Sequence, residues 1–452
     1  MKKKRFSLST TQTVLVSFLL VILVGSVLLS LPISTKDGEG IRYIDSLFTA
    51  VTATCVTGLV TVPVAETFSY FGQTVILLLI EIGGLGFITV ITAFMVILKR
   101  KLGISNRILI QDAFNLNSLS GIVRFVKKVV VGTLLVQLTG ALLYMPVFVS
   151  DFGVRGIWIS VFNAVSAFCN AGIDVIGTNS LMDYATNPVV NGVTAALIIL
   201  GGIGFVVWWD VLDALRNLKK RGLKCFKGLS LHSKLAIFIT LSLIVSGTAL
   251  IFIFEYNNPK TIGGMGLFDK LQVSFFQSVT TRTAGFATIP QENLTDSSSL
   301  LSMILMLIGG SPVSTAGGMK TVTAGVLVLE AISVIKNKEE VAAFNRNIPQ
   351  KVVKKAVTVA LVFFFAAAFS SILLTAFTDL EFLDIAYESV SAVATVGLTR
   401  GITPYLNDIG KTIIILTMYI GRIGPLSLVF AFHIKNKNEN TVKNPSEDIS
   451  VG

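Results

Sequence analysis

The chain has 452 residues, of which 52% are hydrophobic and only 14% charged, and its mean hydropathy is +0.77. These values exclude a water-soluble enzyme, a disordered chain and a nucleic-acid-binding domain, and they indicate a polytopic membrane protein. The net charge is +11, and three cysteines and two histidines provide neither a disulfide framework nor ligands for a transition metal.

Eight apolar segments are each long enough to cross a bilayer, which takes about 20 residues. The first follows the basic residues 2–5. We interpret it as a retained helix, because it is longer than the core of a signal peptide and no small-residue cleavage site follows it. An even number of passes places both termini on one side. The segments are 12–32, 73–98, 129–149, 191–209, 235–254, 299–333, 356–377 and 411–432.

The distribution of basic residues orients the chain. With the N-terminus in the cytoplasm, the cytoplasmic segments carry 27 of the 37 Lys and Arg residues. This is the positive-inside pattern of a plasma-membrane protein, so we expect both termini in the cytoplasm and no nucleic-acid partner. The basic loops 99–128, 216–234 and 336–355 suit docking of either an acidic regulatory protein or anionic lipid, and the sequence does not choose between them.

Between the two passes of each pair lies a shorter amphipathic stretch on the outer side, which indicates a re-entrant helix. Each stretch ends in a glycine, and an aromatic residue lies ten residues before it. The stretches are 42–60, 156–173, 267–286 and 382–398. The glycines are Gly58, Gly172, Gly285 and Gly397, and the aromatics are Phe48, Phe162, Phe275 and Tyr387.

The glycines are spaced by 114, 113 and 112 residues, which reveals an internal repeat. Each unit uses two passes, so all four have the same orientation. We predict an all-α integral membrane protein with four parallel helix–pore-loop–helix repeats around a pseudo-fourfold central pore. The repeats are assigned to residues 1–100, 101–215, 216–340 and 341–434, and residues 435–452 form a cytoplasmic tail.

A glycine at each loop has a physical reason. Coordination of a bare K⁺ requires backbone carbonyls aimed at one axis, and glycine reaches the necessary left-handed conformations without steric cost. The short helices also direct their partial negative charge toward the ion. Side chains before the glycines differ, so only the backbone provides matching ligands. The predicted filter comprises Val56, Thr57, Gly58, Asn170, Ala171, Gly172, Thr283, Ala284, Gly285, Thr395, Val396 and Gly397.

Two departures from the repeat lie inside apolar spans. Residues 309–320 read GGSPVSTAGGMK and interrupt the sixth span. The interruption is either a loop that lies in the ion cavity or a plain kink of the helix. Arg422 stands where the other units have glycine, at a depth where a charge costs about 2.5–3.5 kcal/mol. We interpret Arg422 as a pore-facing barrier, and the alternative is a structural ion pair with Glu81.

Several residues near the glycines have more than one interpretation. Cys55 and Cys169, three residues before their glycines, are interpreted as small packing residues. Arg282 takes that place in the third unit, where it either braces the filter through backbone carbonyls or forms a surface pair. Asp45 and Asp384 begin short helices as helix-start charges or as weak attractors of cations.

At the four glycine motifs the chain resembles the Trk/Ktr/HKT superfamily of K⁺ transporters, and within it the KtrB-type membrane subunit. The matching segments are TCVTGL at 54–59, FCNAG at 168–172, TRTAGF at 281–286 and ATVGLT at 394–399. The resemblance covers essentially the whole chain. TrkH subunits carry two additional N-terminal helices that this sequence does not show, which favours the Ktr branch.

The resemblance implies a channel-like K⁺ uptake subunit that forms a homodimer on a cytosolic ring of nucleotide-binding KtrA-type regulators. It also implies stimulation by Na⁺, and it places an intramembrane gate at the interrupted span. No organic cofactor and no enzymatic activity are expected. The candidate gate residues are Gly309, Gly310, Ser311, Ser314, Thr315, Ala316, Gly317, Gly318, Lys320 and Arg422.

The alternative function is a secondary cation symporter with a binding site at the membrane midplane. Such transporters often contain inverted repeats and broken helices. The parallel repeats and the lack of a shared acidic site within the spans argue against it.

Overall fold

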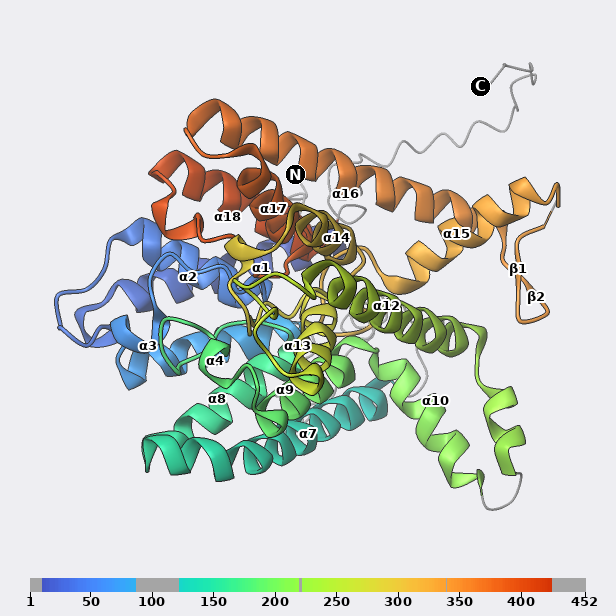
Figure 1. The fold of residues 1–452 in the computed structure, drawn as a ribbon, viewed down its shortest axis with the longest axis horizontal. Coiled ribbons are helices and arrows are strands. Elements are labelled where there is room, and N and C mark those ends of the chain that lie inside the picture. Colours follow the sequence, from blue (N-terminus) through green and yellow to red (C-terminus); the bar gives the residue numbers. More distant parts are fainter. Residues whose placement is uncertain (1–9, 87–121, 219–221, 339, 425–452) are drawn as a thin grey trace, which may run out of the picture.

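The computed structural model describes residues 10–86, 122–218, 222–338 and 340–424. Parts of two predicted spans, at 87–98 and 425–432, lie outside these residues, as do most of the basic loop 99–128 and the tail 435–452. Helices dominate the described chain, and Figure 1 shows their arrangement.

Four long helices in the described residues are sufficiently long and apolar to cross a membrane. Their large apolar side chains point outward, as in Val245 and Phe365, each more than 60% exposed. Lipid-facing surfaces have this character, since nothing polar is needed there. The helices are α1 (Thr10–Ser30), α7 (Ile122–Phe152), α12 (Leu231–Glu255) and α16 (Gln350–Phe377).

A shorter helix follows each long one and packs against it. These helices match the predicted re-entrant stretches and are largely buried, including many of their Ser and Thr residues. They are α2 (Tyr43–Cys55), α8 (Arg155–Cys169), α13 (Leu267–Thr280) and α17 (Phe382–Ala394).

A third helix completes each group. It begins at a polar N-cap whose side chain accepts a backbone N–H of the first turn, which fixes where the helix starts. The N-caps are Ser69, Asn187, Thr295 and Asn407. The helices are α4 (Tyr70–Leu85), α9 (Pro188–Gly202), α14 (Asp296–Leu307) and α18 (Asp408–Ile423).

Two of these third helices are interrupted. The predicted span at 191–209 is bent: α9 ends at Gly202 and the chain turns by 101° into α10 (Phe205–Arg216). Gly204 permits the bend with a φ of +96°. The predicted interruption of the span 299–333 is correct, since α14 ends at Leu307 and α15 (Thr321–Ile335) begins after an irregular loop. The described residues therefore contain four candidate spanning helices, or five candidate spans if the bent pair counts as one span.

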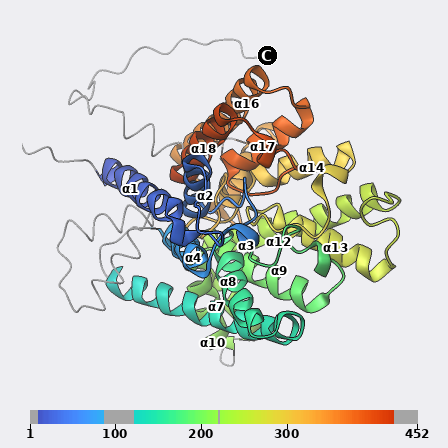
Figure 2. The ribbon, with the colours of Figure 1, turned by 90° about the vertical axis from the view of Figure 1, so that its left-hand side faces the viewer.

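The four groups close into a ring. The third helix of each group packs against the short helix of the next: α4 against α8, α9 against α13, α14 against α17, and finally α18 back against α2. Figure 2 shows the groups following one another around the centre, from blue through green and yellow to red. The glycine loops after the short helices are thus brought toward a common region.

The remaining elements are small. The strands β1 (Ala342–Ala343) and β2 (Arg346–Asn347) form an antiparallel hairpin between α15 and α16. This hairpin and α10 project at the same side of the molecule, on the right in Figure 1. The other short elements are α3 (Val64–Thr67), η1 (Pro32–Ser34), η2 (Met182–Tyr184), η3 (Gly222–Gly228), η4 (Gln291–Asn293) and η5 (Thr403–Tyr405).

Candidate functional site

The four predicted filter glycines lie next to one another. Each has a positive φ, from +65° at Gly172 to +103° at Gly58. A Cβ built on any of them would lie within 2.6 Å of a carbonyl oxygen of the next loop, so the positions accept only glycine. The four contacts join Gly58 to Ala171, Gly172 to Ala284, Gly285 to Val396 and Gly397 to Thr57. The carbonyls one residue before each glycine therefore meet at the same place.

The residue two positions before each glycine adopts the left-handed conformation, although it is never glycine. These residues are Val56, Asn170, Thr283 and Thr395. In the first group, the helix terminus is capped within the same loop: the Thr57 N–H donates to the Thr52 carbonyl at 2.8 Å. The same bond recurs in the second and fourth groups. Each loop is thus held mainly by its own short helix.

A hydroxyl six residues before the glycine adds a second cap. The N–H of Gly58 donates to Thr52 Oγ1, and that of Gly397 donates to Ser391 Oγ, both at 3.0 Å. The third group has Val279 at this place, and Thr280 Oγ1 instead donates to the Phe286 carbonyl at 2.7 Å. The different residue pattern of the third repeat therefore reflects a different way of capping the same turn.

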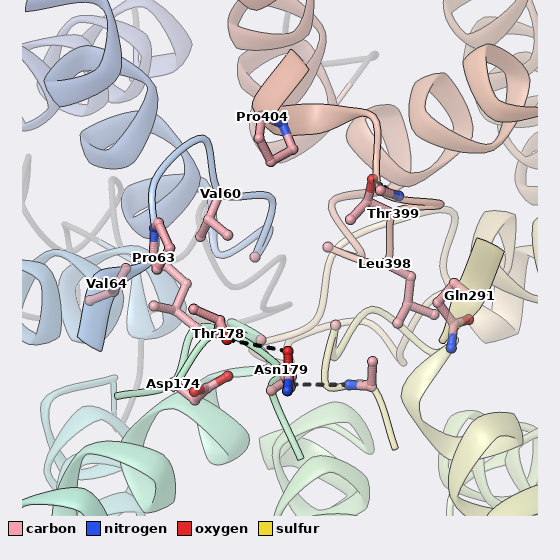
Figure 3. Close-up of a pocket in the computed structure, with 18 of the residues that line it drawn as sticks. Val60, Pro63, Val64, Asp174, Thr178, Asn179, Gln291, Leu398, Thr399 and Pro404 are labelled. Carbon is pink, nitrogen blue, oxygen red and sulfur yellow. Dashed lines mark hydrogen bonds between the residues drawn. The ribbon is translucent and has the colours of Figure 1, made fainter. Parts of the chain in front are cut away.

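All four glycines line a cavity of about 450 Å³, which we call the outer cavity because it lies on the side that the sequence predicts to be outside. Figure 3 shows part of its lining, including Asp174 and Thr399. The Asp174 carboxylate accepts the N–H of Ile176 at 3.1 Å. Burial raises the pKa of this carboxyl to about 6. Sequence reasoning did not single out Asp174, although its place two residues after Gly172 was a signal.

Below the glycines lies the irregular segment 308–320, which we call the intramembrane loop. Its partners include residues of the second and fourth groups as well as of its own group. Thr315 Oγ1 donates to the Phe168 carbonyl at 3.0 Å and lies 3.1 Å from Asn170 Oδ1. The Gly317 N–H donates to Thr283 Oγ1 at 3.1 Å. The predicted gate segment is therefore in contact with two of the predicted filter loops.

The bent helix α9 supplies further partners for the loop. The N–H of Ser311 donates to the Gly202 carbonyl at 2.8 Å, and that of Thr315 donates to the Gly201 carbonyl at 3.2 Å. The break in α9 leaves these carbonyls without a partner in their own helix, and the loop satisfies them. The break in α9 thus provides hydrogen-bond acceptors, and the intramembrane loop between α14 and α15 provides the matching donors.

Arg422 joins the intramembrane loop to the first group. Its guanidinium donates to the Thr315 carbonyl at 2.8 Å and to the Gly83 carbonyl at 2.5 Å. The alternative of an ion pair with Glu81 is wrong, since Glu81 accepts from Gln137 at 2.8 Å and from Cys169 at 3.4 Å.

Lys320 anchors its own loop. Its ammonium group donates to the Ala316 carbonyl at 2.6 Å. The two basic side chains, Arg422 and Lys320, thus both bind backbone oxygens of the loop.

The other acidic and basic candidates also have definite partners. Asp45 forms a buried ion pair with Lys411 at 2.6 Å, and Asp384 forms a partly buried ion pair with Arg400 at 2.6 Å. These carboxylates are therefore not free to attract ions. Arg282 donates to the Gly309 carbonyl at 3.4 Å. Its bond is to the intramembrane loop and its side chain is buried, so both predicted alternatives for Arg282, a brace of the filter carbonyls and a surface pair, are wrong.

The sequence of this chain matches a known family over nearly its whole length. The profile of TrkH, described as cation transport protein, matches residues 2–444. The chain belongs to the TrkH family of cation transport proteins. The resemblance found at the four glycine motifs is therefore confirmed.

Relatives and a solved structure agree with this assignment. The chain is 40% identical to the potassium/sodium uptake protein NtpJ of Enterococcus hirae, over 100% of this chain and 99% of the relative. It is also 40% identical to the Ktr system potassium uptake protein B of Bacillus subtilis, over 98% of this chain and 96% of the relative. The potassium transporter TrkH of Vibrio parahaemolyticus shares the fold, with a TM-score of 0.70 and 18% identity. The match covers 96% of this chain and 86% of the solved one.

Proposed function

We propose that this TrkH-family protein takes up K⁺ across the plasma membrane as the ion-translocating subunit of a Ktr-type system. The observation that carries the proposal is the meeting of four glycine loops, whose preceding carbonyls face neighbouring loops. Such carbonyls replace the hydration shell of K⁺. Relatives named as potassium uptake proteins support the choice of ion.

The proposed architecture is a pseudo-fourfold pore made by the four repeats at 1–100, 101–215, 216–340 and 341–434. The cyclic packing of third helices on short helices supports it. Eight passes, with both termini in the cytoplasm, complete the topology. The proposed filter is the set of twelve residues at 56–58, 170–172, 283–285 and 395–397.

The intramembrane loop and Arg422 are the proposed gate. The loop lies against the filter loops at Asn170 and Thr283, and Arg422 holds it to the Gly83 carbonyl. An ion leaving the filter meets this loop, so its displacement opens the path. A KtrA-type ring, a homodimer and stimulation by Na⁺ belong to the same proposal. Relatives named as Ktr system proteins support a complex with a regulatory subunit.

The test is K⁺ uptake complementation in a host that lacks its own K⁺ uptake, with and without a KtrA-type partner. Growth at low external K⁺ is expected, and no growth in either arm contradicts the proposal. Flux of K⁺, Rb⁺ and Na⁺ into liposomes separates a channel-like path from the symporter alternative. Downhill K⁺ flux without a co-ion supports the channel, whereas a fixed stoichiometry with a second ion supports the symporter.

A further inference from the structure

Two residues beyond each of the four glycines, a residue lines the outer cavity. These four residues are Val60, Asp174, Ala287 and Thr399, and we call them the mouth ring. Figure 3 shows Val60, Asp174 and Thr399 on different sides of the cavity. Because the glycine loops meet, the mouth ring marks the outer entrance of the proposed filter. Only one of its members carries a charge.

All charged side chains in the cavity lining are negative. The lining contains two carboxylates, Asp174 and Glu292, and no Lys or Arg. Asp174 takes part in none of the ion pairs found among the described residues. Nearby arginines have other partners: Arg400 binds Asp384, and Arg155 donates to the Val175 carbonyl at 3.2 Å. A concave surface lined with charges of one sign concentrates counter-ions.

Asp174 is also held in place. Its carboxylate accepts the Ile176 N–H at 3.1 Å. The loop that follows is tied to the third group, because the Leu181 N–H donates to the Ala287 carbonyl at 3.0 Å and the Ala287 N–H donates to Ser180 Oγ at 3.3 Å. The negative charge is thus fixed beside the mouth ring member of the neighbouring group.

We propose that Asp174 is the outer affinity-determining residue of this transporter. Its carboxylate raises the local concentration of monovalent cations at the mouth ring and so lowers the external K⁺ concentration needed for half-maximal uptake. The inference rests on the proposed function of the glycine loops as a K⁺ filter. It assigns attraction of the ion to the second repeat alone, whereas all four repeats supply the coordinating backbone.

The first test separates the charge of the Asp174 carboxylate from its hydrogen bond with the Ile176 N–H. Asp174→Asn keeps an acceptor for the Ile176 N–H and removes the charge. We expect a rise of about three- to tenfold in the KM for K⁺ uptake at about pH 8, with the maximal rate unchanged, because one negative charge is lost from the cavity lining. Asp174→Glu should keep a KM near that of the wild type. Asp183→Asn is the matched control, because Asp183 is an exposed carboxylate of the same repeat that does not line the cavity, and we expect a change of less than about twofold.

The second test screens the charge. Replacing sorbitol with choline chloride at constant osmolarity should raise the wild-type KM toward that of Asp174→Asn, and leave the KM of the variant unchanged. A purely structural role in the turn does not respond to salt. An Asp174→Asn protein with the wild-type KM, or a wild-type KM that is independent of ionic strength, overturns the inference. The second of these outcomes decides the question even if the variant fails to fold.

A wild-type protein that takes up no K⁺ at all refutes the proposed function instead. The two failures are therefore distinguishable.

Discussion

The glycine loops and the intramembrane loop are both irregular backbone, yet they are stabilised in different ways. A glycine loop is capped mainly within its own group, as when Gly397 donates to Ser391 and Val396 donates to the Ser391 carbonyl. The intramembrane loop depends on residues of other groups, including Gly201, Asn170 and Arg422. The first arrangement favours a fixed conformation, whereas the second ties the loop to neighbouring groups by individual hydrogen bonds, so the loop can move when those bonds break.

The largest expected effect comes from breaking a glycine loop. In Gly397→Ser, the new Cβ would overlap the Thr57 carbonyl oxygen, and the φ of +96° would be strained. We expect K⁺ uptake to fall by at least about tenfold, or K⁺ selectivity over Na⁺ to be lost, in a flux assay. Gly192→Ser is the control, because a Cβ there meets open space. Unchanged ion preference in serine variants of all four filter glycines would contradict the assignment.

Removing part of the intramembrane loop should have the next largest effect, in the opposite direction. Deletion of residues 314–316 removes the bonds of Thr315 to Asn170, Gly201 and Arg422. We expect the maximal K⁺ uptake rate to rise by more than about tenfold, since several hydrogen bonds of the closed state are lost. Ion preference should stay the same, because the glycine loops keep their own caps. An unchanged maximal rate would contradict a gating role and would support the alternative that the segment is a plain helix kink.

Arg422→Ala tests one contact of the same loop. Loss of the two bonds from the guanidinium to the Thr315 and Gly83 carbonyls should raise K⁺ flux by about tenfold or less. Arg216→Ala is the control, since its exposed ion pair with Asp213 lies within one helix. Size-exclusion chromatography of the purified variant checks folding. A protein that fails to insert or fold would instead assign Arg422 a structural role.

The smallest effect is expected from the hydroxyl caps. Ser391→Ala removes the acceptor for the Gly397 N–H and should lower the free energy of unfolding by about 1 kcal/mol, seen as a lower midpoint of thermal unfolding in detergent. Ser166→Ala is the matched control in the second group, where the hydroxyl has no hydrogen-bond partner among the described residues. Equal shifts for both variants would show that the cap does not stabilise the loop.

Repetition determined what the sequence could predict. The four glycines and short helices recur at a nearly constant spacing, so comparison of the repeats found them without any structure. The interruption at 309–320 was visible because Gly and Pro break helices. The bend in the second group was missed. The bend after Gly202 depends on the Ser311 and Thr315 N–H groups of another repeat, and no local pattern shows such a partner.

Side-chain partners were the least predictable part. Glu81 and Arg422 have opposite charges at similar depths, and this suggested an ion pair. In the structure, Arg422 binds backbone carbonyls and Glu81 binds Gln137. Charge complementarity alone does not specify a partner where carbonyl oxygens freed by loops and helix ends are also available.

The ion pair between Asp45 and Lys411 has a consequence for biosynthesis. Asp45 lies in α2, and its partner in α18 is made 366 residues later. Until α18 has entered the bilayer, α2 lacks its last neighbour and a carboxylate intended for burial stays without a counter-charge. Until translation is almost finished, the Asp45 carboxylate of α2 must therefore be hydrated, hydrogen-bonded to other groups, or outside the hydrocarbon core. Closure of the ring of four helix groups is thus a late event, because it requires α18 to pack against α2.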